Sequence, residues 1–161
     1  MEETRIETRD EGSVTHKGDP GGSEVNVFAD SSALAKRYIA DEQSSEMDET
    51  LQHATNLAVS ILCLMEIISA LCRLRRERFL KPSEYAIAKN ALQADLADAA
   101  IIQITDEVLI HSVRLLESHP LRSSDAIQVS SALVWGADLF VSSDARQCTA
   151  AQKSGLNVVQ L

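Results

Sequence analysis

The fold of this 161-residue chain is decided by residues 25–34, which read Val25-Asn26-Val27-Phe28-Ala29-Asp30-Ser31-Ser32-Ala33-Leu34. The mostly apolar run Val25–Ala29 predicts a short buried strand, and Asp30 follows directly at its carboxyl end. A helix is expected next, from about Ser32 to Ile39. A carboxylate leaves water at a high cost unless a partner compensates its charge. The stretch therefore predicts a buried strand that delivers an acidic side chain to one edge of a sheet.

The rest of the chain alternates between apolar runs of strand length and longer segments with helical periodicity. Further strands are predicted over Asn56–Ser60, Ala100–Ile104, Asp138–Ser142 and Asn157–Gln160. Helices are predicted over Ser44–His53, Ile61–Phe79, Ser83–Leu96, Asp106–Ser118, Ser124–Trp135 and Ala145–Ser154. This alternation predicts an α/β fold with three layers, α/β/α, around a central, mostly parallel sheet. In the long helix, the buried stripe is expected to consist of Leu64, Ile67, Ile68, Leu71 and Leu74.

Three more acids stand in positions that resemble that of Asp30. Glu66 interrupts an apolar helix, Asp125 opens another helix, and Asp144 follows the strand that ends at Ser142. Three of the four acids have no basic residue beside them in the sequence. Functional groups of parallel sheets gather at the carboxyl ends of the strands. The four acids are therefore expected to share one cleft there.

This pattern of carboxylates predicts that their partner is a divalent cation. Hard cations such as Mg²⁺ or Mn²⁺ prefer oxygen ligands, and no cluster of His or Cys residues offers a zinc site instead. Asp30 and Asp144 are expected to hold the ion most directly, while the other two acids complete its shell or position its waters. Ser32 and Ser142 are candidates to orient a carboxylate or a water.

Each of these residues also has a purely structural interpretation. The three aspartates stand where helices are expected to begin, and Asp is a favoured N-cap. Glu66 would then belong to the polar face of an amphipathic helix. The hydroxyls of Ser32 and Ser142 would be simple turn or cap groups. Both interpretations remain open from the sequence.

The net charge of −9 argues at first against a polyanionic partner, since phosphate binders are usually basic. A bound cation would cancel much of the charge of the four acids. Arg73 follows Glu66 on the same helix and Arg146 follows Asp144, so both are candidates to contact phosphates. The basic cluster at 73–81 is equally explained as a solvated helix end beside the negative end of the dipole.

Residues 1–23 are polar and of mixed charge, which predicts a disordered leader before a domain over residues 24–161. The leader has no apolar segment that would form a signal peptide. No stretch reaches the roughly 20 apolar residues that a membrane span needs. The odd count of three cysteines without C-x-x-C spacing fits a reducing compartment. A cytoplasmic location is therefore expected.

Four segments together resemble PIN domains, particularly the VapC-type toxins of toxin–antitoxin pairs. Residues 27–36, Val27-Phe28-Ala29-Asp30-Ser31-Ser32-Ala33-Leu34-Ala35-Lys36, resemble the opening of these domains. The family's other three acidic motifs also have counterparts here. The segments that resemble the second, third and fourth motif are Glu66–Leu71, Leu121–Gln128 and Leu139–Asp144. The order of the motifs is that of the family, and the similarity runs from about Val25 to Leu161. Ser142 departs from the Thr that the family more often has there, but it keeps the hydroxyl.

The resemblance implies a metal-dependent endoribonuclease in which Asp30, Glu66, Asp125 and Asp144 form the catalytic, metal-binding group. The cation would lower the pKa of a bound water for in-line attack on an RNA phosphodiester. Relatives of this kind are usually homodimers and are restrained by a small antitoxin protein. A catalytically inactive binding module that acts through a protein partner is the main alternative, but all four acids are present.

Other acidic α/β proteins match less well. A metal-dependent adhesion domain would need a serine where Leu34 stands, and an aspartyl-phosphate enzyme usually has a second Asp where Ser32 stands.

Overall fold

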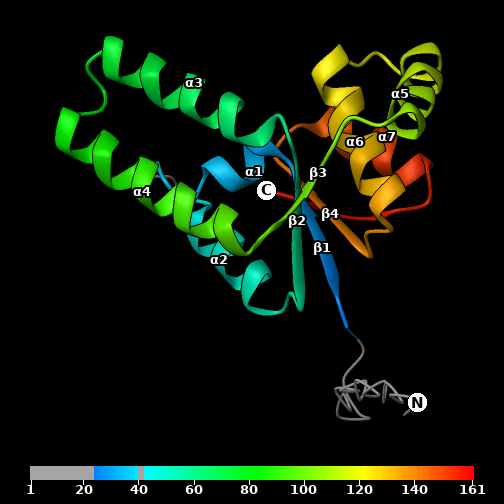
Figure 1. Cartoon of the computed structure of the whole chain (residues 1–161), viewed down its shortest axis with the longest axis horizontal. Coiled ribbons are helices and arrows are strands. Elements are labelled where there is room, and N and C mark those ends of the chain that lie inside the picture. Colours follow the sequence, from blue (N-terminus) through cyan, green and yellow to red (C-terminus); the bar gives the residue numbers. More distant parts are fainter. Residues whose placement is uncertain (1–23, 40–41) are drawn as a thin grey trace, which may run out of the picture.

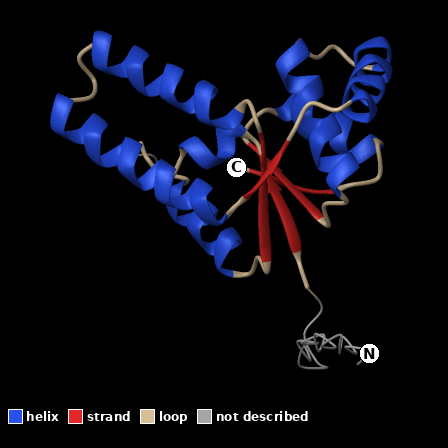
Figure 2. Ribbon diagram, viewed as in Figure 1, coloured by secondary structure: helices blue, strands red, loops and turns tan. Residues whose placement is uncertain are grey.

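A computed structural model describes residues 24–39 and 42–161 of the chain. Its strands are β1 (Asn26–Ala29), β2 (Asn56–Ser60), β3 (Ala100–Ile102), β4 (Leu139–Ser142) and β5 (Asn157–Gln160). They form one sheet in the order β3-β2-β1-β4-β5, shown in red in Figure 2. Every pairing is parallel. The α/β fold predicted from the sequence is therefore confirmed.

The predicted leader, residues 1–23, lies outside the described residues and stays a prediction.

Helices cover both faces of this sheet. The helices are α1 (Ser31–Ala35), α2 (Ser44–Gln52), α3 (Cys63–Arg76), α4 (Pro82–Asp98), α5 (Asp106–Ser118), α6 (Ser123–Trp135) and α7 (Ala145–Lys153). In Figure 1, α1 to α4 lie on one side of the sheet and α5 to α7 on the other, which gives the three predicted layers. The helix predicted from Ser32 to Ile39 is shorter, because residues 36–38 form tight turns whose amides bond three residues back.

The core consists of two clusters that the alternating side chains of β1 separate. Val27 and Ala29 pack against α1, α3 and α4 on one face. Phe28 points to the other face and meets α6 and α7, with its ring stacked on that of Phe140 at a centroid distance of 6.0 Å. Since β1 is the middle strand, it is buried on both faces, as expected for a parallel sheet. This places the residue after β1 in the middle of the carboxyl edge of the sheet.

The buried stripe of α3 differs from the predicted one. Cys63, Ile67 and Leu71 are the buried residues, whereas Leu64 is 39% exposed and Leu74 only partly buried. A helix turns by roughly 100° per residue, so a stripe through Cys63 carries its neighbour Leu64 away from the core. The prediction for Leu64 was wrong.

None of the helices in the described part of the chain has the length and apolar character that a membrane span needs.

Replacing Phe28 by Ala is expected to destabilise the chain by about 3–5 kcal/mol, because the change leaves a cavity where two rings stack. Phe79→Ala is the matched control, since Phe79 is 78% exposed and its loss should change stability by less than about 0.5 kcal/mol. Urea unfolding of both variants measures the difference. Equal effects of the two changes would contradict the placement of Phe28 in the core.

Candidate active site

The four acids singled out in the sequence line one cavity of about 260 Å³. Asp30 follows β1, and Asp144 lies two residues after β4, at the same edge of the sheet. Glu66 and Asp125 come from the first turns of α3 and α6. The expected shared cleft therefore exists, and it is called the acidic cavity below. The catalytic and metal-binding roles of its residues stay predictions.

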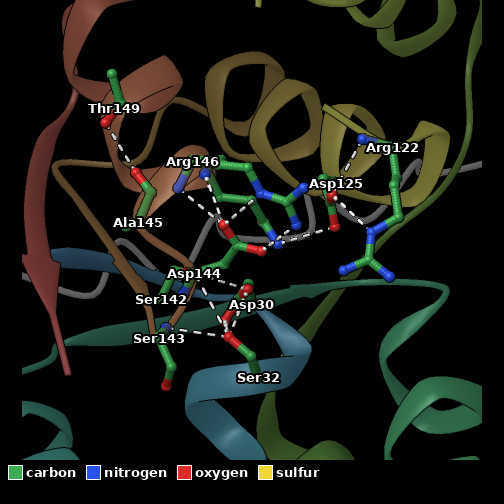
Figure 3. A network of polar contacts seen from close by, with 11 residues as sticks. Asp30, Ser32, Arg122, Asp125, Ser142, Ser143, Asp144, Ala145, Arg146 and Thr149 are labelled. Carbon is green, nitrogen blue, oxygen red and sulfur yellow. Dashed lines mark hydrogen bonds and ion pairs between the residues drawn. The ribbon is translucent and has the colours of Figure 1, made fainter. Parts of the chain in front are cut away.

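Asp30 is the most deeply buried of these acids, with 1% of its surface exposed. Its carboxylate accepts hydrogen bonds from the hydroxyls of Ser32 and Ser142, at 2.8 Å each (Figure 3). It also accepts from the backbone N–H of Ala33, at 2.8 Å. Burial raises the pKa of Asp30 to about 6, although these hydrogen bonds oppose the rise and the charge of Glu66 adds to it. Asp30 is both the N-cap of α1 and a member of the cavity. The two interpretations of this residue are thus compatible.

The serine hydroxyls join two loops that are far apart in the sequence. Besides donating to Asp30, the hydroxyl of Ser142 accepts from the backbone N–H of Asp144 at 3.0 Å. The hydroxyl of Ser32 accepts from the N–H of Ser143 at 3.0 Å. Both hydroxyls therefore orient a cavity carboxylate and cap a turn at once, so here too the alternatives do not exclude each other.

Glu66 has its own neutral donors. Its Oε2 atom accepts from the hydroxyl of Ser31 in a short hydrogen bond, and from Nε2 of Gln128 at 2.7 Å. Glu66 therefore contacts α1 and α6 across the cavity. A carboxylate on a solvated helix face would lack such partners, so the simple amphipathic interpretation of Glu66 does not describe the structure.

Two of the acids have an arginine neighbour. The Asp125 carboxylate accepts from the N–H of Arg122 at 3.1 Å and lies 3.6 Å from its guanidinium. The Asp144 carboxylate lies 3.1 Å from the guanidinium of Arg146. Partial burial acts to raise the pKa of Asp144, but the hydrogen bonds from the side chain and backbone of Arg146 outweigh it and lower that pKa. The sequence indicated no basic neighbour for Asp125, because Arg122 stands one helical turn away.

The two candidate phosphate contacts lie differently. Arg146 lies at the acidic cavity through its ion pair with Asp144 (Figure 3). Arg73 is exposed in the last turn of α3 and does not line the cavity. Seven residues separate it from Glu66, a rise of roughly 10 Å along the helix. Its neighbour Arg75 stacks on the ring of Tyr85 at 4.9 Å, which supports a structural role for that part of the basic cluster.

Two glutamines that were not predicted from the sequence line the acidic cavity. Gln128 of α6 donates to Glu66, and Gln147 of α7 donates to the Asp125 carboxylate at 3.2 Å. A signal was present, because each glutamine follows an acid by three residues on a helix. That spacing places acid and amide on one helical face.

The donor set of the cavity fits a hard divalent cation. It consists of carboxylate, hydroxyl and amide oxygens, and the amide oxygens of Gln128 and Gln147 are buried without a hydrogen-bond partner in the described part of the chain. Within residues 24–39 and 42–161, no three His, Cys, Asp or Glu side chains are close enough to form a ready-made metal site. Mg²⁺ is typically held by only one or two carboxylates together with waters and substrate phosphates, so this spacing does not exclude it.

Comparison with known proteins gives matches over most of the chain. The family model described as PIN domain matches residues 27–153. Ribonuclease VapC45 from Mycobacterium tuberculosis (strain CDC 1551 / Oshkosh) is 30% identical over 135 residues, covering 82% of this chain and 93% of its own length. Ribonuclease VapC49 from strain ATCC 25618 / H37Rv matches with the same figures.

Solved structures share the fold at low sequence identity. VapC20 from Mycobacterium tuberculosis, a sarcin-ricin loop cleaving toxin, has a TM-score of 0.62 and 16% identity and covers 84% of this chain and 99% of its own. VapBC2 from Rickettsia felis, bound to a DNA fragment from its promoter, has a TM-score of 0.61 and 12% identity, with coverage of 85% and 99%. A toxin–antitoxin complex from Klebsiella pneumoniae has a TM-score of 0.59 and 17% identity, with coverage of 83% and 96%.

An Asp30→Asn variant is expected to be more stable than the native chain at pH 8 and to lose this advantage near pH 4. The folded-state pKa of about 6 exceeds the ordinary 3.8, so folding favours the protonated acid. The native chain therefore loses stability as the pH rises through this interval, by roughly 3 kcal/mol in total, and the amide avoids that loss. Urea unfolding of both proteins at the two pH values, in the presence of a chelator, measures the difference. An advantage that does not change with pH would contradict the raised pKa.

Proposed function

Because the chain belongs to the PIN-domain family, we propose that it is a metal-dependent endoribonuclease and the toxin of a toxin–antitoxin pair. The observation that carries this proposal is the single cavity lined by Asp30, Glu66, Asp125 and Asp144. The two VapC ribonucleases at 30% identity support the same reaction. Proteins of this family are typically metal-dependent, so the substrate would be an RNA phosphodiester and the cofactor Mg²⁺ or Mn²⁺.

Asp30 and Asp144 would hold the cation most directly, and Glu66 and Asp125 would complete its shell or orient its waters. When bound, the cation would lower the pKa of a water and stabilise negative charge on the phosphate. The chain itself keeps the carboxylates in place. Asp30 is fixed by three donors, and burial together with the charge of Glu66 raises its pKa.

The arginines are the groups that would bind the phosphate chain of RNA. Arg122 lines the cavity, and Arg146 lies beside Asp144 with its side chain about half exposed. Arg73 would contact the RNA farther along α3. Aromatic side chains are absent from the described lining of the cavity, so base stacking offers no sequence readout there. The choice of RNA would then rest on the shape of the substrate or on a partner.

We also infer a homodimer and a small antitoxin partner. Toxin–antitoxin complexes are among the structural neighbours, which supports the antitoxin. An apolar groove beside the outer strand β3 supports self-association, and its exposed side chains are Ile61, Leu64, Met65 and Ile101. The chain carries a net charge of −9, so two copies repel each other as they approach. An uncharged apolar surface is where such copies would meet at the lowest electrostatic cost.

The purified protein is expected to cut RNA in the presence of Mg²⁺ or Mn²⁺, and Asp125→Asn is expected to reduce the cleavage rate by roughly 100-fold or more. Asp106→Asn is the matched control, because Asp106 is an exposed acid in the first turn of α5. Sequencing the RNA ends and measuring circular dichroism of each variant separates lost chemistry from lost folding. If the native chain does not cut RNA, or if Asp125→Asn cuts it at the native rate, the proposed mechanism fails.

Mg²⁺ or Mn²⁺ is expected to raise the melting temperature, because binding to the folded state alone stabilises it. The gain is roughly 2.7 kcal/mol when the free cation is 100-fold above its dissociation constant. Chelation should reverse the shift, and Asp30→Asn should weaken it. Differential scanning fluorimetry measures it, with NaCl of equal ionic strength as the control. A melting temperature that is the same with and without either cation would contradict the shared cation site.

A further inference from the structure

Two glutamines of the acidic cavity share an unusual arrangement. Gln128 and Gln147 are 2% and 4% exposed. Each donates from its Nε2 atom to a cavity carboxylate. Each also leaves its Oε1 atom buried, without a hydrogen-bond partner among the described residues. Both amides therefore use their donors and not their acceptors.

Gln128 joins three elements. Its Nε2 atom donates to Oε2 of Glu66 at 2.7 Å and to the hydroxyl oxygen of Ser31 at 2.8 Å. The hydroxyl of Ser31 in turn donates to Glu66. Both hydrogens of the amide are thus engaged, and the amide cannot be turned around, because its oxygen would then face a carboxylate. The carboxylate of Glu66 is held from α1 and α6 at the same time.

Gln147 joins two of the other acids. Its side chain donates to Oδ1 of Asp125 at 3.2 Å, and its backbone N–H donates to Oδ1 of Asp144 at 3.3 Å. One residue of α7 therefore fixes the distance between a carboxylate of α6 and its own N-cap. Together with Gln128, it connects all of the helices that carry Glu66, Asp125 and Asp144.

Each amide has two opposing effects on folding stability. Its hydrogen bond to a carboxylate contributes roughly 1.5–3 kcal/mol, and its buried Oε1 atom without a partner costs about 1–3 kcal/mol. Because these effects offset each other, the orientation of the carboxylates is the better explanation for the two glutamines. A neutral amide orients a carboxylate and leaves its negative charge intact, unlike the guanidinium groups of Arg122 and Arg146. A carboxylate that is fixed and still negative is what a cation ligand requires.

We propose that Gln128 and Gln147 are positioning residues of this nuclease: they fix the carboxylates of Glu66 and Asp125 in the cavity without adding positive charge to them. The inference rests on the proposed function, because it assigns these acids to the cation and its waters. It concerns neither the identity of the RNA nor direct contact of either amide with it.

The test compares Gln128→Met and Gln147→Met with the native chain, and Gln93→Met serves as the control, since Gln93 is exposed on α4. Methionine keeps the length of the side chain and removes both the donor and the orphaned acceptor. We expect kcat for RNA cleavage and Mn²⁺ affinity, measured by titration calorimetry, each to fall by about 10- to 100-fold. KM should stay within about twofold, since the amides are not assigned a contact with RNA. The melting temperature without cations should change little, because the lost hydrogen bond and the removed orphan acceptor offset each other.

Native kcat and native Mn²⁺ affinity in both variants would overturn the proposal. A fall in the melting temperature that accompanies the loss of activity would also overturn it, because the glutamines would then be structural. If the native chain binds Mn²⁺ but does not cut RNA, the proposed function fails, and Mn²⁺ affinity of the variants alone decides the role of the glutamines. Should Gln128→Met not fold, Gln128→Leu provides the same comparison.

Discussion

The arrangement of this molecule depends on one buried carboxylate, that of Asp30. It ends the middle strand of the sheet, and a hydroxyl 112 residues later in the chain donates to it. A carboxylate in this position is costly, and burial raises its pKa to about 6 in spite of three hydrogen-bond donors. The hydrogen bonds that lower this cost also align the loops after β1 and β4. The same hydrogen bonds thus stabilise the charge of Asp30 and set the geometry of the acidic cavity.

The cavity holds its acids in two different ways. Asp30 and Glu66 are held by hydroxyl, amide and backbone donors, which direct the oxygen atoms and leave the charge in place. Asp125 and Asp144 lie beside guanidinium groups, which partly neutralise them, and Gln147 also donates to both. The two acids without an arginine neighbour therefore lie at the starts of α1 and α3. Positive groups lie on the side of α6 and α7, where a polyanion would find them.

The sequence alone predicted much of the fold, because apolar runs of strand length alternate with amphipathic helices. The positions of Asp30 and Asp144 also followed from it, since residues after parallel strands share one edge. The two interpretations of Asp30, as a helix cap and as a residue of the cavity, did not exclude each other, because its side chain caps α1 and also lines the cavity. The pattern could not reveal the contacts of Gln128 or Arg122, which depend on side-chain directions. It also misplaced Leu64, whose exposure depends on where the buried stripe of α3 begins.

The parallel sheet with β1 as its middle strand has a consequence for folding during translation. As the chain leaves the ribosome, β1, which Asp30 follows, emerges more than 100 residues before its neighbour β4. Contacts between segments so distant in sequence form late in folding. The acidic cavity therefore cannot assemble on a nascent chain until β4 and the start of α7 have been made, and a product of translation that stops before them would lack it.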